Sequence, residues 1–140
     1  MIKSTFPLNY DQSKLRKLCE KYSLDLVILH GSRATGKLHQ ESDIDIAVLV
    51  GRKNKIKNHR LDMVGNFSEL FGDNCDLVVL NHTESMIAYQ AATKGILLYE
   101  VKRGLFNAFK TVAITRYQDA AKFRRLEARY LQTAIERTPR

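Results

Sequence analysis

The chain has 140 residues, a length that predicts one domain around a single core. Its composition, 44% hydrophobic and 27% charged, excludes global disorder, and no apolar run reaches the roughly 18 to 20 residues that cross a bilayer. The N-terminus lacks the apolar core of a secretory signal, so we expect a cytoplasmic protein.

The net charge of +8 at first suggests a nucleic-acid partner, but it is unevenly distributed. Residues 1–100 hold 13 Lys and Arg against 12 Asp and Glu, whereas residues 101–140 hold 10 against 3. The excess therefore belongs to the C-terminal region. Cys19 and Cys75 stand far apart without neighbouring ligand residues, which argues against a zinc site or a disulfide framework and favours two buried thiols.

The first half of the chain alternates helical and extended patterns. Apolar residues at helical spacing predict a first helix ending near residue 22, with Asp11 or Ser13 as its cap. Residues 24–30 are an apolar run ended by Gly31, which predicts a buried strand. Residues 43–50 alternate as a second strand. After a polar connection from 51 to 60, residues 61–71 predict a helix closed by Gly72.

In the second half, residues 76–80 predict a third strand and residues 84–92 a helix capped by Thr83 and ended by Gly95. A short strand follows over residues 96–99, and a long helix is predicted from Gly104 to about Ile135, stopped by Pro139. Strands alternating with helices predict an α/β (α+β) fold, one mixed sheet flanked by helices. We expect a domain over residues 1–100 and a helical extension over 101–140.

The chemistry-bearing residues lie where the first two strands end and begin. Gly31-Ser32 follows a buried strand and opens a turn whose free backbone N–H groups suit phosphate. Asp43 and Asp45 share one face of the second strand, where they can bracket one or two divalent ions. Asp76, at the head of the third strand, is the third carboxylate that a two-metal site requires. This set predicts transfer of a nucleotidyl group from a nucleoside triphosphate.

Gly31–Gly36 followed by Ser42–Val48 resembles the GSRAxG…SDIDxxV motif of minimal nucleotidyltransferases in the DNA polymerase β-like superfamily. The resemblance covers about residues 14 to 100, and it includes a third-aspartate strand over 75–78 and a closing strand over 95–100. It implies an ATP-dependent adenylyltransferase with two Mg²⁺ ions. The implied catalytic and metal-binding residues are Asp43, Asp45 and Asp76, and the implied nucleotide-binding residues are Gly31, Ser32, Arg33 and Ser42.

Small stand-alone members of this family are similar to antitoxins that pair with HEPN-domain toxins and transfer AMP to a tyrosine hydroxyl of the toxin. The resemblance thus implies a hetero-oligomer with such a toxin. Two alternatives stay open: a non-catalytic subunit that neutralises its partner by contact, and nucleotidyl transfer to RNA or a small molecule. His30 stands where this family more often has Phe, and we expect it to pack at the strand end rather than act as a base.

The predicted C-terminal helix carries an apolar stripe too long for a sheet of this size to cover. We therefore expect part of it to contact another chain, either a second copy in a homodimer or the toxin. Its basic residues predict a single basic face, which either attracts an acidic partner or keeps a self-packed helix soluble; they are Lys102, Arg103, Lys110, Arg116, Lys122, Arg124, Arg125 and Arg129.

Overall fold

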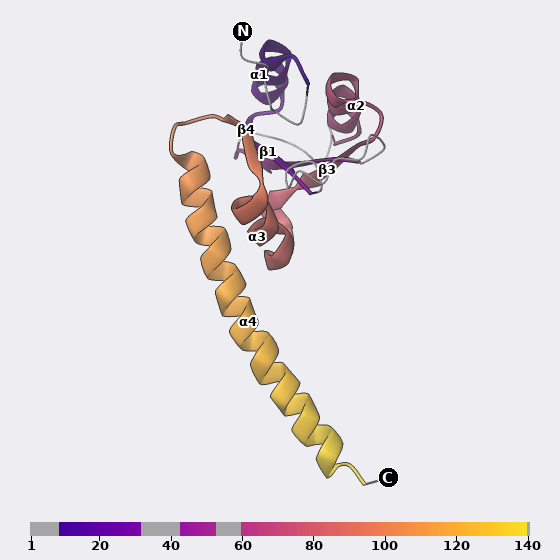
Figure 1. The fold of residues 1–140 in the computed structure, drawn as a ribbon, viewed down its shortest axis with the longest axis vertical. Helices are drawn as coiled ribbons and strands as arrows, with labels where there is room; N and C mark the ends of the chain where they lie inside the picture. The colour runs from indigo at the N-terminus through magenta and orange to yellow at the C-terminus, as the bar shows by residue number, and fades with distance from the viewer. Residues whose placement is uncertain (1–8, 32–42, 53–59, 140) are drawn as a thin grey trace.

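A computed structural model describes residues 9–31, 43–52 and 60–139 (Figure 1). Its elements, in chain order, are α1 (Gln12–Lys21), β1 (Leu24–His30), β2 (Ile44–Val50), α2 (Arg60–Phe71), β3 (Cys75–Val79), the 3₁₀ helix η2 (Leu80–His82), α3 (Ser85–Lys94), β4 (Ile96–Glu100) and α4 (Leu105–Arg137). None of the helices in these described ranges is both long and apolar enough to span a membrane.

The strands form one mixed sheet in the order β3-β2-β1-β4. Strand β1 runs antiparallel to both β2 and β4, while β2 and β3 are parallel and are joined through α2. Because β1 points the opposite way from β2 and β3, its C-terminal end lies at the same edge of the sheet as the N-terminal ends of those two strands. The mixed α/β fold predicted from the sequence is confirmed.

Helices cover both faces of the sheet, because alternate strand residues on each face are apolar. On one face, α1 and α2 pack against β1 and β2 through large side chains such as Leu15, Met63 and Phe67. On the other face, α3 and α4 pack against Leu26, Ile28 and Ala47 of the sheet, in a cluster that includes Ala91 and Phe106. The core therefore has two unequal halves, and the cluster on the α3–α4 face is the smaller one.

Most element boundaries agree with the sequence analysis, including β1 and the Asp11 cap, whose carboxylate accepts hydrogen bonds from the amides of Ser13 and Lys14. The predicted Thr83 cap is wrong. Helix α3 begins after Glu84, and the Thr83 hydroxyl instead donates to the Leu80 carbonyl at 3.3 Å. This happens because β3 ends at Val79, one residue earlier than predicted, and the chain turns at once into η2.

The Asn81 side chain fastens this turn to the sheet. Its Oδ1 accepts from the Val50 amide and its Nδ2 donates to the Val50 carbonyl, both at 2.8 Å. One side-chain amide thus supplies the donor and the acceptor that a neighbouring strand would offer. The end of β2 is thereby tied to the segment that leads into α3.

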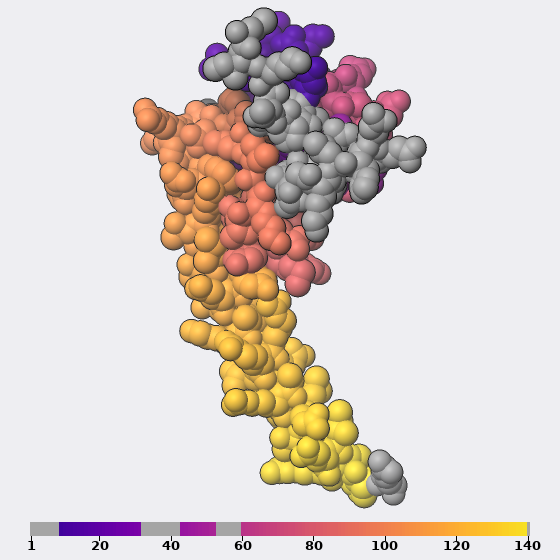
Figure 2. Space-filling view, viewed as in Figure 1, coloured from indigo at the N-terminus to yellow at the C-terminus, as the bar shows by residue number. Residues whose placement is uncertain are grey.

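Helix α4 is anchored at its start and leaves the body at its end (Figure 1). Gly104 precedes it with a φ of +92°, and the Glu100 carboxylate accepts hydrogen bonds from the Gly104 and Phe106 amides at 3.4 and 3.1 Å. The first part packs along α3, where the rings of Tyr89 and Tyr117 stack with centroids 4.1 Å apart. Beyond this stack, the helix extends past α3 into solvent (Figure 2).

The single basic face predicted for this helix is wrong. Two of the residues precede the helix, Lys110 lies over the Phe106 ring at 4.4 Å, and Arg124 lies over the Tyr117 ring at 5.2 Å. At 100° per residue the six positions within α4 spread around the helix rather than along one side. Lys122, Arg125 and Arg129, spaced i, i+3 and i+7, are the part of the set that shares a continuous stripe away from those rings.

Candidate functional site

Three polar side chains form a row across the sheet at the edge where β1 ends and β2 and β3 begin. His30 of β1 is paired with Asp45 of β2, and Asp45 is in turn paired with Asp76 of β3. Residues directly opposite one another on neighbouring strands project from the same face, with Cβ atoms about 4.5 to 5.5 Å apart. The register therefore brings the two carboxylates and the imidazole together on the α3–α4 face.

Gly31 follows His30 and has a φ of +78°, a conformation that favours glycine. The space where a Cβ would stand is taken by Asp45: its Oδ2 lies 2.2 Å and its Cγ 3.1 Å from that position. The Asp45 carboxylate therefore lies directly over the backbone of the strand end. A glycine is required here on two grounds, the positive φ and the contact with Asp45.

The charges in this row affect one another. Burial raises the pKa of the Asp45 carboxyl above its usual value; the neighbouring His30 lowers it, and the carboxylates of Asp76 and Asp43 raise it further. Asp43, which immediately precedes β2, is exposed, but it is thus close enough to act on Asp45 electrostatically. A divalent cation relieves this effect of the Asp76 and Asp43 carboxylates on Asp45.

His30 differs from a simple packing residue. Its Nε2 is buried and has no hydrogen-bond partner, although its strand position places it beside Asp45. Burial lowers the pKa of the imidazole, against the opposing effect of Asp45 and Asp76. The sequence analysis did not place this ring in the row. The position of His30 could have indicated this, because His30 is the last residue of β1 and β1 lies next to β2, the strand that carries Asp45.

Of the residues predicted for the site, the structure brings together Gly31, Asp43, Asp45 and Asp76. Ser32, Arg33 and Ser42, predicted to bind nucleotide, lie outside the described residues.

No three His, Cys, Asp or Glu side chains within residues 9–31, 43–52 and 60–139 are grouped so that they could hold a metal ion by themselves. Mg²⁺, however, commonly uses one or two protein carboxylates and completes its octahedron with phosphate oxygens and water. The adjacent Asp45 and Asp76 fit that donor set. A magnesium site here would depend on the nucleotide as well as on the protein.

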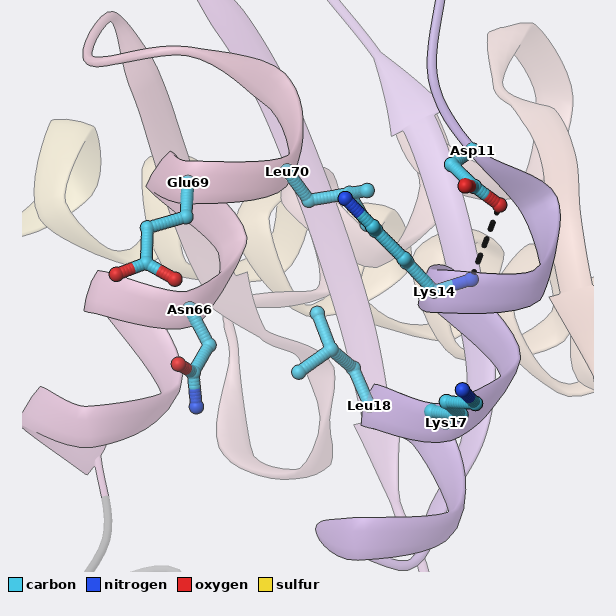
Figure 3. A pocket seen from close by; sticks show the side chains of 7 residues that line it. All are labelled: Asp11, Lys14, Lys17, Leu18, Asn66, Glu69 and Leu70. Atoms are coloured by element: carbon cyan, nitrogen blue, oxygen red, sulfur yellow. Dashed lines mark hydrogen bonds between the residues drawn. The ribbon is translucent and has the colours of Figure 1, made fainter.

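A hollow of about 390 Å³ between α1 and α2 is separate from this row (Figure 3). Lys14 and Lys17 line it from α1 and Asn66 and Glu69 from α2, with Leu18 and Leu70 between them. The two helices that form it cover the face of the sheet opposite Asp45. Its mixed charges and its position give it no part in the chemistry of the carboxylates.

Comparison with known proteins agrees with the geometry of the carboxylate row. Residues 13–104 match the family described as polymerase beta, nucleotidyltransferase. The chain belongs to this family. It is therefore a nucleotidyltransferase, and the matched segment contains Gly31 and all three aspartates.

Two relatives are named protein adenylyltransferase MntA. The protein from Aphanizomenon flos-aquae is 29% identical over 132 residues, which is 88% of each chain. The protein from Shewanella oneidensis is 30% identical over 102 residues, 71% of each chain. Because the same share of both chains is covered in each comparison, the two relatives have nearly the same length as this chain.

Solved structures with the same fold come from toxin–antitoxin complexes. One, a toxin–antitoxin crystal structure with AMP-PNP, has a TM-score of 0.71 at 26% identity and covers 87% of this chain and 98% of that one. Another, a mutant MntA–HpeT toxin–antitoxin complex, has a TM-score of 0.68 at 26% identity, covering 89% and 99%. The coverage of nearly the whole neighbouring chain means that the likeness extends beyond the sheet.

Proposed function

We propose that this nucleotidyltransferase transfers AMP from ATP to a tyrosine hydroxyl of a HEPN-domain toxin and so acts as its antitoxin. The observation that carries the proposal is the pairing of Asp45 with Asp76 on neighbouring strands, with the Asp45 carboxylate against Gly31. Two carboxylates thus lie next to a glycine backbone that a phosphate can approach closely. The relatives named protein adenylyltransferase support adenylyl transfer to a protein. The toxin–antitoxin structure with AMP-PNP supports both an adenine nucleotide and a toxin partner.

In this proposal, Gly31 and Ser32 lie against the triphosphate, with Arg33 and Ser42 adding polar contacts. Asp43, Asp45 and Asp76 hold Mg²⁺, which when bound neutralises phosphate charge and lowers the pKa of the attacking hydroxyl. The tyrosine oxygen forms a bond to the α-phosphorus, the bond from that phosphorus to the bridging oxygen breaks, and pyrophosphate leaves. The hydroxyl proton passes to water, so the products are AMP-tyrosine and pyrophosphate.

The test incubates the chain with α-labelled ATP, Mg²⁺ and the cognate HEPN-domain toxin. We expect label on the toxin, confined to tyrosine, and its loss by at least a hundredfold in Asp43→Ala plus Asp45→Ala. Glu20→Ala plus Glu69→Ala is the matched control, because it also removes two carboxylates, both exposed on the helices of the opposite face. Unlabelled toxin, or transfer by the aspartate variant equal to that of the control, would refute the proposal.

Contact without catalysis is a second candidate, favoured by the exposed outer part of α4 described below. The two are separated by measuring the toxin's activity with the chain present and ATP absent. Inhibition that needs ATP and the aspartates supports the enzyme, and equal inhibition by the double-aspartate variant without ATP supports the binding subunit.

A further inference from the structure

The outer segment of α4, residues 118–137, exposes an unusual amount of apolar surface. Phe123 and Tyr130 are each 75% exposed, Ile135 is 70%, Leu126 62% and Leu131 51%. In the first part of the same helix, by contrast, the inward residues are buried against α3 and the sheet. No described element lies over the outer segment, which projects from the body in Figures 1 and 2.

The exposed side chains are ordered along the helix. Phe123, Leu126 and Tyr130 are spaced i, i+3 and i+7, the spacing of a seam that packs against another helix. Phenylalanine and tyrosine are among the residues enriched at the centres of protein interfaces, whereas scattered single apolar residues are normal on any surface. A regular seam on an unsupported helix indicates an interface that forms with another molecule.

Basic side chains border this seam. Lys122, Arg125 and Arg129 form a stripe along it, and together with Leu126 they line a groove of about 350 Å³. Arg129 and Arg137 line the next groove, of about 340 Å³, with Tyr130 and Ala134. In each groove, apolar side chains lie next to arginine guanidinium groups. Such a groove fits a partner that presents an apolar side chain with a carboxylate beside it.

The charge of the segment decides between a second copy and a different partner. Residues 118–137 hold five Lys and Arg against three Asp and Glu. Two copies packed antiparallel on this seam would bring the same basic stripe from each copy together, which is unfavourable. An apolar helix face carrying acidic residues satisfies both the seam and its basic border.

We propose that the outer segment of α4 is the docking site for the protein that accepts the nucleotide, and that it binds an apolar, acidic helix face of that protein. The inference rests on the proposed function for the identity of the partner. Helix α4 is also fixed to the catalytic body, through Glu100 at its start and through the Tyr89–Tyr117 stack, so a docked protein keeps a defined position relative to Asp45 and Asp76.

The test measures the affinity of the full-length chain for the cognate HEPN-domain toxin without ATP, and then the kinetics of AMP transfer. Phe123→Ser plus Tyr130→Ser removes the seam, and Arg125→Glu plus Arg129→Glu reverses its border. We expect each pair to weaken toxin binding at least tenfold and to raise the KM for toxin by a similar factor, with kcat within twofold of the parent. All four side chains are exposed, so the thermal unfolding midpoint should stay unchanged.

Matched controls come from exposed residues of the body. Leu61→Ser removes an apolar side chain that is 88% exposed on α2, and Lys14→Glu plus Lys17→Glu changes the net charge as much as the arginine pair does. Both should bind toxin as the parent does. If they weaken binding equally, the effect is one of general charge or solubility and the docking site is refuted.

Other occupants give different results. A dimer of the chain alone in sedimentation that Phe123→Ser plus Tyr130→Ser dissociates, with toxin binding unchanged, would overturn the proposal in favour of a second copy. RNA binding abolished by Arg125→Glu plus Arg129→Glu, again with toxin binding unchanged, would overturn it in favour of nucleic acid. Toxin that binds the segment but takes no label refutes the proposed function alone, and normal KM in both variants refutes the docking site alone.

Discussion

Replacing Gly31 by alanine should damage the site and the fold at once, for two separable reasons. The φ of +78° is in the left-handed region, where an L-residue costs about 1–2 kcal/mol. In addition, the new Cβ would stand 2.2 Å from the Asp45 Oδ2. That distance is too short for any contact, so the carboxylate must turn away from the strand end.

The collision adds to the backbone cost. Inserting a methyl group into a packed place costs about 1–3 kcal/mol, and the lower part of that range applies because Asp45 is only half-buried and can rotate. We expect Gly31→Ala to lower the free energy of unfolding by roughly 2–4 kcal/mol in total. Since the displaced group is the central carboxylate of the row, AMP transfer should fall at least a hundredfold.

Gly104 provides the control for the backbone contribution. Its φ is +92°, but a Cβ there would meet nothing within 4 Å. Gly104→Ala should therefore cost about 1–2 kcal/mol in urea unfolding and leave transfer to a tyrosine peptide unchanged.

A double-mutant cycle isolates the collision. In an Asp45→Ala background, Gly31→Ala should cost close to what Gly104→Ala costs, because the Oδ2 and Cγ atoms that it meets are gone and only the Cβ, at 3.3 Å, remains. If Gly31→Ala costs no more than Gly104→Ala in the parent chain, or keeps its activity, the inferred contact between Asp45 and the strand end is wrong.

Four other changes test single contacts. Asn81→Ala should cost about 1–3 kcal/mol in urea unfolding and Asn81→Asp an intermediate amount, since aspartate keeps the acceptor and loses the donor. Glu100→Ala should cost about 0.5–2 kcal/mol and speed amide exchange in the first turn of α4. His30→Phe, which replaces a partnerless buried nitrogen by an apolar ring, should leave the unfolding midpoint unchanged or raise it. Burial raises the pKa of the Cys19 thiol to about 12, so this thiol should resist alkylation at pH 8 until the chain unfolds. The free energy of unfolding should also fall as the pH rises above 9, because the thiol ionises at a lower pH in the unfolded chain than in the folded one.

The sequence could predict those parts of the fold that depend on local periodicity. Residues 24–30 are mostly apolar and are followed by a glycine, and β1 occupies that range. The alternation after Asp43 likewise predicted which residues of β2 share a face, and the structure packs α1 and α2 against the apolar one. Such patterns report which side of an element is buried, and they do so without knowledge of its neighbours.

Features that depend on pairing between distant elements could not be predicted in this way. The row of His30, Asp45 and Asp76 requires the register of β1 on β2 and of β2 on β3, and alternation alone leaves that register open. The hydrogen bonds of Asn81 to Val50 and of Glu100 to the first amides of α4 likewise depend on the path of the chain through a turn. The sequence therefore identifies the candidate carboxylates, and the strand order and register determine which side chains lie beside them.

The unequal faces of the sheet connect the site to the outer segment of α4. Alanines 88, 92 and 113 are buried where α3 meets α4, and small residues let two helices approach closely. Close packing fixes the direction in which α4 leaves the body, whereas a seam of long, flexible side chains would leave that direction loosely defined. The face that carries Asp45 is thus also the one from which α4 leaves the body, so the proposed docking site on residues 118–137 and the proposed nucleotide site beside Gly31 are held in a fixed relation to each other.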